Sequence, residues 1–342
     1  MQRSSNSLNA DRVLPELYLR ADGDSRMGHG HLFRMLALTE MLKPHFRITF
    51  ITTNKEEYIH GLFKTSGAAV RVVGEYLSYS EEFLSWSADL SATSIIVCDG
   101  YQFDATAQQA LYDKGFRIVV IDDPQNGQFY ARAIINPSGG VDPAMYNTPA
   151  GTAVYTGIAY AFLRPEFLQL ARLRKSPVDF ETAKKVFVCL GGADPENYTE
   201  EVLLNLVNHP NVETINLVTG SAFLHKNSLS AVMSEFPGRI NHYNKLSAAE
   251  LASLMRENDA AVCSASTVCY EYLCCGFNLF ILQTALNQEN SFNFLLKEQL
   301  AIDFRYFGSD TKPDIGKITE SFDGCQDQRI VDVFLKLATT DL

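Results

Sequence analysis

The sequence lacks several features that would point to a particular class of protein. It contains no Cys-x-x-Cys pair, no Gly-Lys-Ser/Thr loop and no uninterrupted apolar run long enough to cross a bilayer. Residues 1–12 are rich in Ser and Asn and show no apolar stretch typical of a signal peptide. These absences exclude a P-loop and argue against a zinc finger or a membrane span. We therefore expect a cytoplasmic protein with no membrane partner.

Basic residues are also scarce relative to acidic ones. Lys and Arg number 29 against 40 Asp and Glu, giving a formal net charge of −11. Such a surface repels phosphate polymers, so nucleic acid is not an expected partner. A small anion can still be held locally by helix N-termini. The seven cysteines are interpreted as reduced core thiols without a metal role.

A chain of 342 residues suggests two domains. Short apolar runs typical of buried strands alternate with amphipathic, helix-like segments. The runs are 17–20, 47–51, 70–73, 94–98, 117–121 and 133–135 in the first half, and 186–190, 214–218, 239–243, 260–263 and 279–282 in the second. This alternation predicts the α/β class, with two Rossmann-like, doubly wound domains facing a central cleft.

A charged, proline-containing stretch separates the two series of runs and indicates a linker. The predicted divisions are a disordered tail over 1–14, a first domain over 15–165, a linker over 166–185 and a second domain over 186–342. A capping box, Ser247-x-x-Glu250, predicts a helix start in the second domain, and Gly276 a helix end. A final helix is expected over 327–337, either folding back across the cleft or capping the second domain.

The first strand runs into a glycine-rich loop that we interpret as the catalytic loop. Gly28 and Gly30 allow close approach of the backbone to a ligand, and a helix beginning near His31 offers unpaired N–H groups to an anion. An imidazole at this point can take a proton from water near neutral pH, although it could also simply cap the helix. His29 is not separable from His31 by this reasoning. Phe33 stands where the dinucleotide fingerprint requires its third glycine.

Asp22-Gly-Asp24 has the Asp-x-Asp form that some glycosyltransferases use to hold a metal. Two aspartates supply too few oxygen ligands for a hard cation, and Asp is common in turns. No metal site and no cofactor are predicted.

Three loops of the second half are candidate substrate-binding segments. Gly191 and Gly192 follow a strand and permit close approach to a ligand, or form a simple tight turn. The hydroxyl-bearing loop of Ser264, Ser266 and Thr267 could seat a diphosphate, and Glu271 could reach ribose hydroxyls or simply favour the helix dipole. Asn287 and Gln288 form a further polar pair opening a helix.

Taken in order, several segments resemble the UDP-2,4-diacetamido-2,4,6-trideoxy-β-L-altropyranose hydrolases of pseudaminic acid biosynthesis, relatives of the glycosyltransferases with the GT-B fold. They cover about residues 17 to 300 and are individually weak but specific as an ordered set. They are Arg20-Ala-Asp22, Gly28-His29-Gly30-His31-x-x-Arg34, Cys98-Asp99-Gly-Tyr101, Ile121-Asp122-Asp123, Gly157-x-x-Tyr160-x-x-x-Arg164-x-Glu166, Cys189-Leu-Gly191-Gly192-x-Asp194, Ser264-Ala-Ser266-x-x-x-x-Glu271 and Asn287-Gln288.

The resemblance implies that His31 is the catalytic base, that Tyr101 lies nearby, that Arg34 belongs to the substrate site, and that the second domain holds UDP. Asp99 could orient His31, hold the sugar or serve as a strand-end turn residue. The family reaction is metal-independent hydrolysis at the anomeric carbon, with inversion. One departure, Gly23-Asp24 where the family more often has small hydroxyl residues, leaves the exact sugar in doubt.

Two other functions share these features. A GT-B glycosyltransferase would use the same histidine with an acceptor hydroxyl in place of water, and a non-catalytic binding protein would hold UDP without turnover. We expect a monomer whose partner is a small UDP-sugar.

Overall fold

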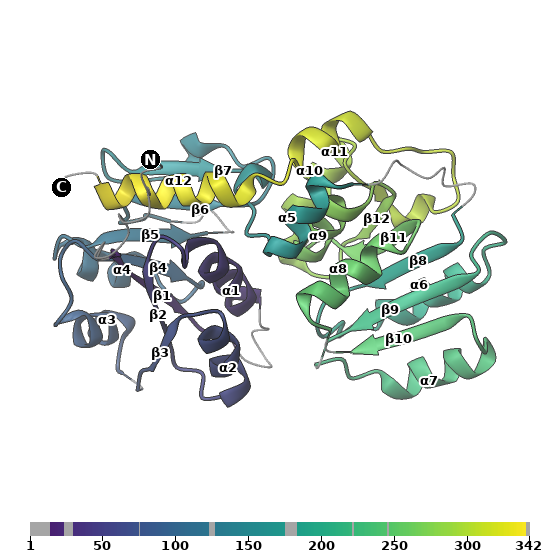
Figure 1. Ribbon diagram of the computed structural model, residues 1–342, viewed down its shortest axis with the longest axis horizontal. Coiled ribbons are helices and arrows are strands. Elements are labelled where there is room, and N and C mark those ends of the chain that lie inside the picture. The colour runs from purple at the N-terminus through teal and green to yellow at the C-terminus, as the bar shows by residue number, and fades with distance from the viewer. Residues whose placement is uncertain are drawn as a thin grey trace, which may run out of the picture.

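A computed structural model describes residues 14–23, 30–74, 76–122, 127–174, 183–220, 222–244 and 246–339. Two α/β domains, each built on a parallel sheet, lie side by side (Figure 1). The predicted tail over 1–14 lies outside the described residues except for its last residue.

The first sheet has the strand order β3-β2-β1-β4-β5-β6-β7, and every pairing is parallel. The strands are β1 Glu16–Ala21, β2 Arg47–Thr52, β3 Ala69–Val72, β4 Ile95–Asp99, β5 Arg117–Ile121, β6 Ala133–Asn136 and β7 Ala153–Thr156. All six predicted strands of this half are confirmed. The prediction missed β7, whose residues are only half-buried and give no continuous apolar signal.

Helices cover both faces of this sheet, which explains the continuous apolar runs. They are α1 Gly30–Leu42, α2 Glu57–Thr65, α3 Tyr79–Ser87 and α4 Ala105–Tyr112, with short 3-10 turns η1 Pro143–Met145 and η2 Ile158–Tyr160. Alternate residues of β4 belong to different cores: Val97 packs with α1, whereas Ile96 and Cys98 pack with α3 and α4. Side chains at the N-cap, Ser78 for α3 and Asp104 for α4, accept helix N–H bonds and fix where these helices begin.

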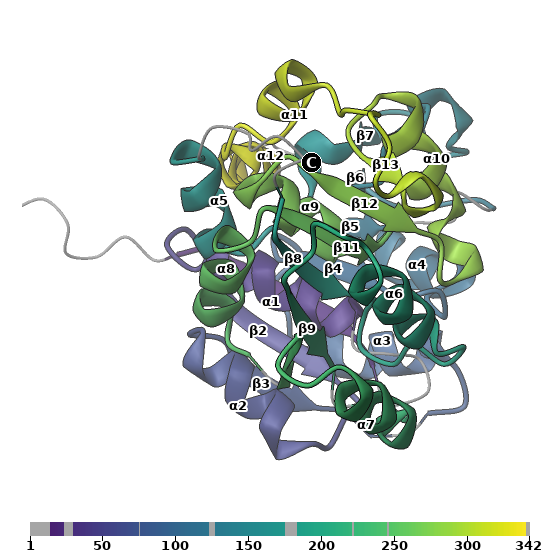
Figure 2. The same cartoon turned by 90° about the vertical axis from the view of Figure 1, so that its right-hand side faces the viewer.

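The second sheet has the order β10-β9-β8-β11-β12-β13, again parallel. Its strands are β8 Lys185–Cys189, β9 Thr214–Thr219, β10 Ile240–Asn244, β11 Ala260–Ser264, β12 Leu279–Leu282 and β13 Ile302–Asp303. Its helices are α6 Tyr198–Val207, α7 Lys226–Glu235, α8 Ala248–Arg256, α9 Thr267–Cys275, α10 Glu289–Lys297 and α11 Ile315–Ser321, with 3-10 turns η4 Leu286–Gln288 and η5 Phe304–Tyr306. Figure 2 shows α6 and α7 on one side of the sheet, opposite α8.

The predicted helix start at Ser247 and helix end at Gly276 are confirmed, whereas the two-residue strand β13 was not predicted. Ser247 and Glu250 form the capping box at the start of α8. Gly276 is the C-cap of α9, in an extended conformation instead of a left-handed one.

Two helices tie the domains together. Helix α5 Pro165–Arg172 starts at the last residue predicted for the first domain and runs into the predicted linker. It has proline at its first turn and packs on α8 and α9. The final helix, α12 Gln326–Thr339, crosses back to the first domain (Figure 1), where Phe334 meets Phe46 with ring centroids 6.2 Å apart. Arg117 donates to the carbonyl of Ala338 at 3.2 Å. Of the two placements considered for the last helix, the structure therefore shows the one that folds back.

Among the described residues, no helix combines the length and the apolar character that a membrane span requires.

Candidate active site

The polar centre of the first domain is a cluster of His31, Arg34 and Asp99. Asp99 is the last residue of β4 and is fully buried, while His31 and Arg34 lie one turn apart on the first turns of α1. His31 Nδ1 lies 2.8 Å from Asp99 Oδ1. Arg34 binds both carboxylate oxygens, through Nε to Oδ2 at 2.8 Å and through Nη2 to Oδ1 at 2.5 Å. The end of β4 and the start of α1 are therefore joined by the bonds from His31 and Arg34 to the Asp99 carboxylate.

The charge of Asp99 sets how the imidazole is held. Burial favours a higher pKa for this carboxyl, but Arg34 and His31 outweigh burial, so the pKa of Asp99 lies below its usual value. A carboxylate only accepts, so His31 Nδ1–H is the donor. Arg34 Nη2, 3.1 Å from the same nitrogen, cannot then donate to it. The other ring nitrogen, Nε2, is consequently the acceptor of the neutral imidazole.

Tyr101 stands beside this cluster, as the resemblance implied. Its ring lies edge-on to that of His31, with centroids 5.1 Å apart and planes at 84°. The side chain of His31 is 15% exposed and Tyr101 is 57% exposed, so this edge of the cluster faces solvent. Gly30 opens α1, whereas Gly28 and His29 lie outside the described residues.

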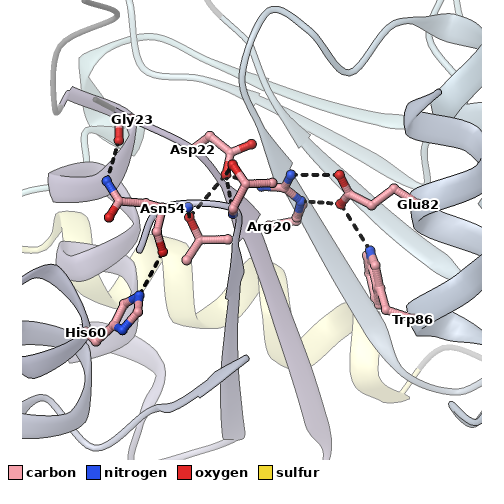
Figure 3. A network of polar contacts seen from close by, with 9 residues as sticks. Arg20, Asp22, Gly23, Asn54, His60, Glu82 and Trp86 are labelled. Carbon is pink, nitrogen blue, oxygen red and sulfur yellow. Dashed lines mark hydrogen bonds and ion pairs between the residues drawn. The ribbon is translucent and has the colours of Figure 1, made fainter. Parts of the chain in front are cut away.

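Asp22 is engaged within the protein (Figure 3). Its Oδ1 lies 2.7 Å from Arg20 Nη1 and accepts from Thr53 N at 2.8 Å and from the hydroxyls of Thr53 and Thr52 at 2.9 and 3.1 Å. Asp24 lies outside the described residues. Over the described ranges, no group of three or more His, Cys, Asp or Glu side chains is arranged to hold a metal ion.

The second domain brings its candidate residues together at the ends of β8 and β11. Gly191 has φ +93°, and a Cβ placed there would stand 3.8 Å from Ser264 Oγ. Ser264 and Ser266 join their hydroxyls at 3.0 Å. Ser266 is the N-cap of α9, but its side chain accepts no bond from the helix. Helix α9 therefore begins beside a glycine turn and two hydroxyls, an arrangement suited to an anion.

Close packing against Gly192 accounts for a glycine on the neighbouring loop, whereas a Cβ on Gly192 itself would meet nothing within 4 Å. A Cβ on Gly220, which follows β9, would stand 2.5 Å from the Cα and O atoms of Gly192. The backbones after β8 and β9 are therefore in contact. Thr267, the first residue of α9, is exposed.

The three remaining candidates, Glu271, Asn287 and Gln288, differ in their burial and in their hydrogen-bond partners. The carboxylate of Glu271, buried in α9, receives two bonds from Arg164. Asn287 is exposed. Gln288 is turned back on its own loop, where its Oε1 accepts from Thr284 N at 2.9 Å.

The domains also meet through a side chain that the sequence analysis did not consider. The ring of Phe294, on α10, fills the space where Gly139 would carry a Cβ, and lies 3.2 Å from the corresponding position on Gly140. Gly139 and Gly140 follow β6 of the first domain. The pair of glycines was the available signal, although nothing in the sequence identifies their partner.

No family model matches the chain. The chain is similar to an uncharacterized protein, MJ1062, of Methanocaldococcus jannaschii, with 23% identity over 285 residues, covering 81% of this chain and 57% of that relative. It is 25% identical over 293 residues to the spore coat polysaccharide biosynthesis protein SpsG of Bacillus subtilis, covering 83% of this chain and 81% of the relative. The UDP-2,4-diacetamido-2,4,6-trideoxy-beta-L-altropyranose hydrolase of Campylobacter jejuni is 22% identical over 303 residues, covering 85% of this chain and 100% of the relative. The resemblance noted in the sequence is thereby confirmed.

Solved structures agree on the fold. A UDP-glucosyltransferase from Polygonum tinctorium superposes with a TM-score of 0.62 at 11% identity, covering 96% of this chain and 99% of the other. MurG from Acinetobacter baumannii superposes with a TM-score of 0.56 at 13% identity, covering 94% of this chain and 100% of the other. The chain therefore has the GT-B fold, two Rossmann-like domains in series.

Proposed function

We propose that this protein hydrolyses a UDP-linked diacetamido-trideoxy sugar to UDP and the free sugar, with inversion at the anomeric carbon, in nonulosonic (pseudaminic) acid biosynthesis. The observation that carries the proposal is the His31–Asp99 bond of 2.8 Å at the carboxyl end of the first sheet. In an α/β sheet this edge is where ligands bind. The similarity to the Campylobacter jejuni hydrolase over 85% of the chain supports the choice of reaction.

In the proposed step, water attacks the anomeric carbon while His31 Nε2 takes its proton. Asp99 holds Nδ1–H, which fixes the ring and stabilises the imidazolium that forms. The bond between the anomeric carbon and the diphosphate oxygen breaks, and its electron pair leaves with UDP. Tyr101, whose ring contacts that of His31, would border the reacting carbon, and Arg34 would keep Asp99 charged.

The second domain is proposed to hold UDP. Gly191, Gly192, Ser264, Ser266 and Thr267 would receive the diphosphate at the N-terminus of α9, where the helix dipole favours the charge that develops on the leaving group. Glu271, one turn further, would accept from ribose hydroxyls. In the first domain, Gly28 and Gly30 would line the sugar. Asn287 and Gln288, in the 3-10 turn before α10, would add further contacts to the substrate.

The test is proton NMR of the protein with the UDP-linked diacetamido sugar, with chelator present and without an acceptor. We expect free UDP and free sugar, the sugar first appearing as the anomer opposite to that of the substrate. His31→Ala should lower the rate by roughly 10²–10⁴-fold while leaving the affinity for UDP unchanged. Binding of UDP without release of sugar would reject the hydrolase and favour a transferase, which an acceptor screen would reveal.

A further inference from the structure

An arginine and a glutamate are paired beside the nucleotide site proposed for the second domain. Arg164 Nε donates to Glu271 Oε1 at 2.8 Å and Nη2 donates to Oε2 at 3.0 Å, so each carboxylate oxygen receives one bond. Glu271 lies one turn after Thr267, the residue that opens α9. The pair therefore lies one helical turn from the point where the diphosphate is proposed to bind.

The same pair borders the end of β8. Burial raises the pKa of the Cys189 thiol to about 11, against a hydrogen bond from the backbone of Gly191 that lowers it. The charges of Glu271 and Arg164 also act on this thiol, in opposite directions. Because Gly191 forms the glycine turn of the proposed site, the pair lies close to that turn as well as to the start of α9.

Neighbouring residues fix both the backbone and the side chain of Arg164. Pro165 disfavours a helical conformation for the residue before it, and Arg164 has the extended angles φ −67° and ψ 146° as the N-cap of α5. The guanidinium lies over the ring of Phe167, 4.9 Å from the ring centroid. Phe167 is fully buried, so the cation lies on a side chain that the core holds in place.

The charge and the orientation of the Glu271 carboxylate both depend on this arginine. An unpaired carboxylate one turn from a diphosphate would repel it, and the guanidinium offsets that charge. A planar guanidinium that binds both oxygens also holds the carboxylate in one rotation. Each carboxylate oxygen can accept two bonds, and Arg164 supplies one to each, so both can still accept from a hydroxyl. The carboxylate is thus arranged to receive two adjacent hydroxyls, as ribose presents at C2′ and C3′.

We propose that Arg164 is a positioning residue that makes the nucleotide site selective for ribose over 2′-deoxyribose. It acts through Glu271, which it holds so that one oxygen accepts from each of the two ribose hydroxyls. A nucleotide that lacks the 2′-hydroxyl would leave one of these charged acceptors without its bond. The inference rests on the proposed function for the assignment of UDP to this site, and on the two hydrogen bonds for the pairing.

The experiment measures the Kd of UDP and of 2′-deoxy-UDP by isothermal titration calorimetry. For the unaltered protein we expect 2′-deoxy-UDP to bind about tenfold or more weakly than UDP, since a hydrogen bond to a charged group is lost. Arg164→Lys keeps the positive charge but not the two parallel bonds. It should weaken UDP about tenfold and reduce the ratio of the two Kd values to about twofold or less.

Arg174→Ala is the matched control, because Arg174 binds the other end of α9. Its side chain donates to the carbonyl of Cys274 at 3.4 Å and to that of Phe322 at 2.7 Å. Its removal should lower the free energy of unfolding and leave the ratio of the Kd values unchanged. Glu271→Gln tests the partner itself and should reduce the ratio as Arg164→Lys does.

If Arg164→Lys keeps the ratio of the unaltered protein while Glu271→Gln loses it, the inference is overturned and the ribose contact of the proposed function stands. Equal binding of the two nucleotides by the unaltered protein, or a ratio preserved in both variants, would overturn the inference and that ribose contact together. Absence of hydrolysis would reject the proposed reaction alone, because the binding measurements need no turnover and still decide the role of Arg164.

Discussion

Arg164 and Glu271, 107 residues apart in the chain, are joined by two hydrogen bonds, from Nε to Oε1 at 2.8 Å and from Nη2 to Oε2 at 3.0 Å. Arg164 precedes α5, which packs on the helix carrying Glu271. Burial alone would lower the pKa of Arg164, but Glu271 raises it overall, so the guanidinium stays charged. The carboxylate proposed to meet the ribose is thus already paired and held in one orientation.

Removing Arg164 should therefore destabilise the protein. Arg164→Ala leaves the Glu271 side chain, only 7% exposed, without its cation, and we expect a loss of about 2–3 kcal/mol in the free energy of unfolding. Glu271→Gln in the same chain should recover part of that loss, because the orphaned charge is gone. Urea denaturation of the two single variants and the double variant measures the coupling. If the losses in unfolding free energy of the two single variants simply add in the double variant, the interaction between Arg164 and Glu271 contributes nothing to stability.

Asp99→Asn tests how His31 is oriented. An amide can present its N–H to the ring and stabilise the wrong tautomer, so kcat should fall by roughly 10²–10⁴-fold with the affinity for UDP unchanged. Asp104→Asn is the matched control, because Asp104 is an exposed helix cap that accepts from Ala107 N at 2.9 Å. It should leave kcat unaltered. Equal activity of Asp99→Asn and the unaltered protein would remove Asp99 from the mechanism.

Asp99 should also shape the acid side of the stability profile. Its native pKa lies below the usual value of 3.8, because Arg34 and His31 outweigh burial. The unfolded chain then binds more protons in this range, so stability rises with pH through it. The contribution of Asp99 is complete above pH 3.8 and is lost as the pH falls through the lower native pKa. Urea denaturation from pH 2 to 6, roughly the range of carboxyl titration, should give a shallower acid slope for Asp99→Asn. Parallel profiles for the two proteins would contradict this.

The sequence predicted the central strands, such as β4, β5 and β11, because every residue in them is buried and they give continuous apolar runs. It missed β7 and β13, which are half-buried or only two residues long. The contact between His31 and Asp99 was predictable because Asp99 ends β4 and His31 lies on the first turn of α1, the helix that follows the neighbouring parallel strand β1. The bond from Arg164 to Glu271 could not be predicted from the sequence, because it depends on how α5 packs on α9. Likewise, no local pattern indicates that Gln288 binds Thr284 of its own loop.

The contact between Gly139 and Phe294 gives a last prediction, on how the domains are held together. A methyl group at Gly139 would occupy the space that the Phe294 ring fills, so Gly139→Ala must push α10 away from the loop after β6. We expect a loss of about 1–3 kcal/mol in unfolding free energy, as for other overpacked sites. In a Phe294→Ala background the ring is absent, and the same methyl should cost little. A penalty that persists without the ring would mean that Gly139 is needed for its own backbone and not for the contact between the domains. Urea denaturation of the four proteins distinguishes the two explanations, with small-angle scattering reporting whether the single variant is more extended.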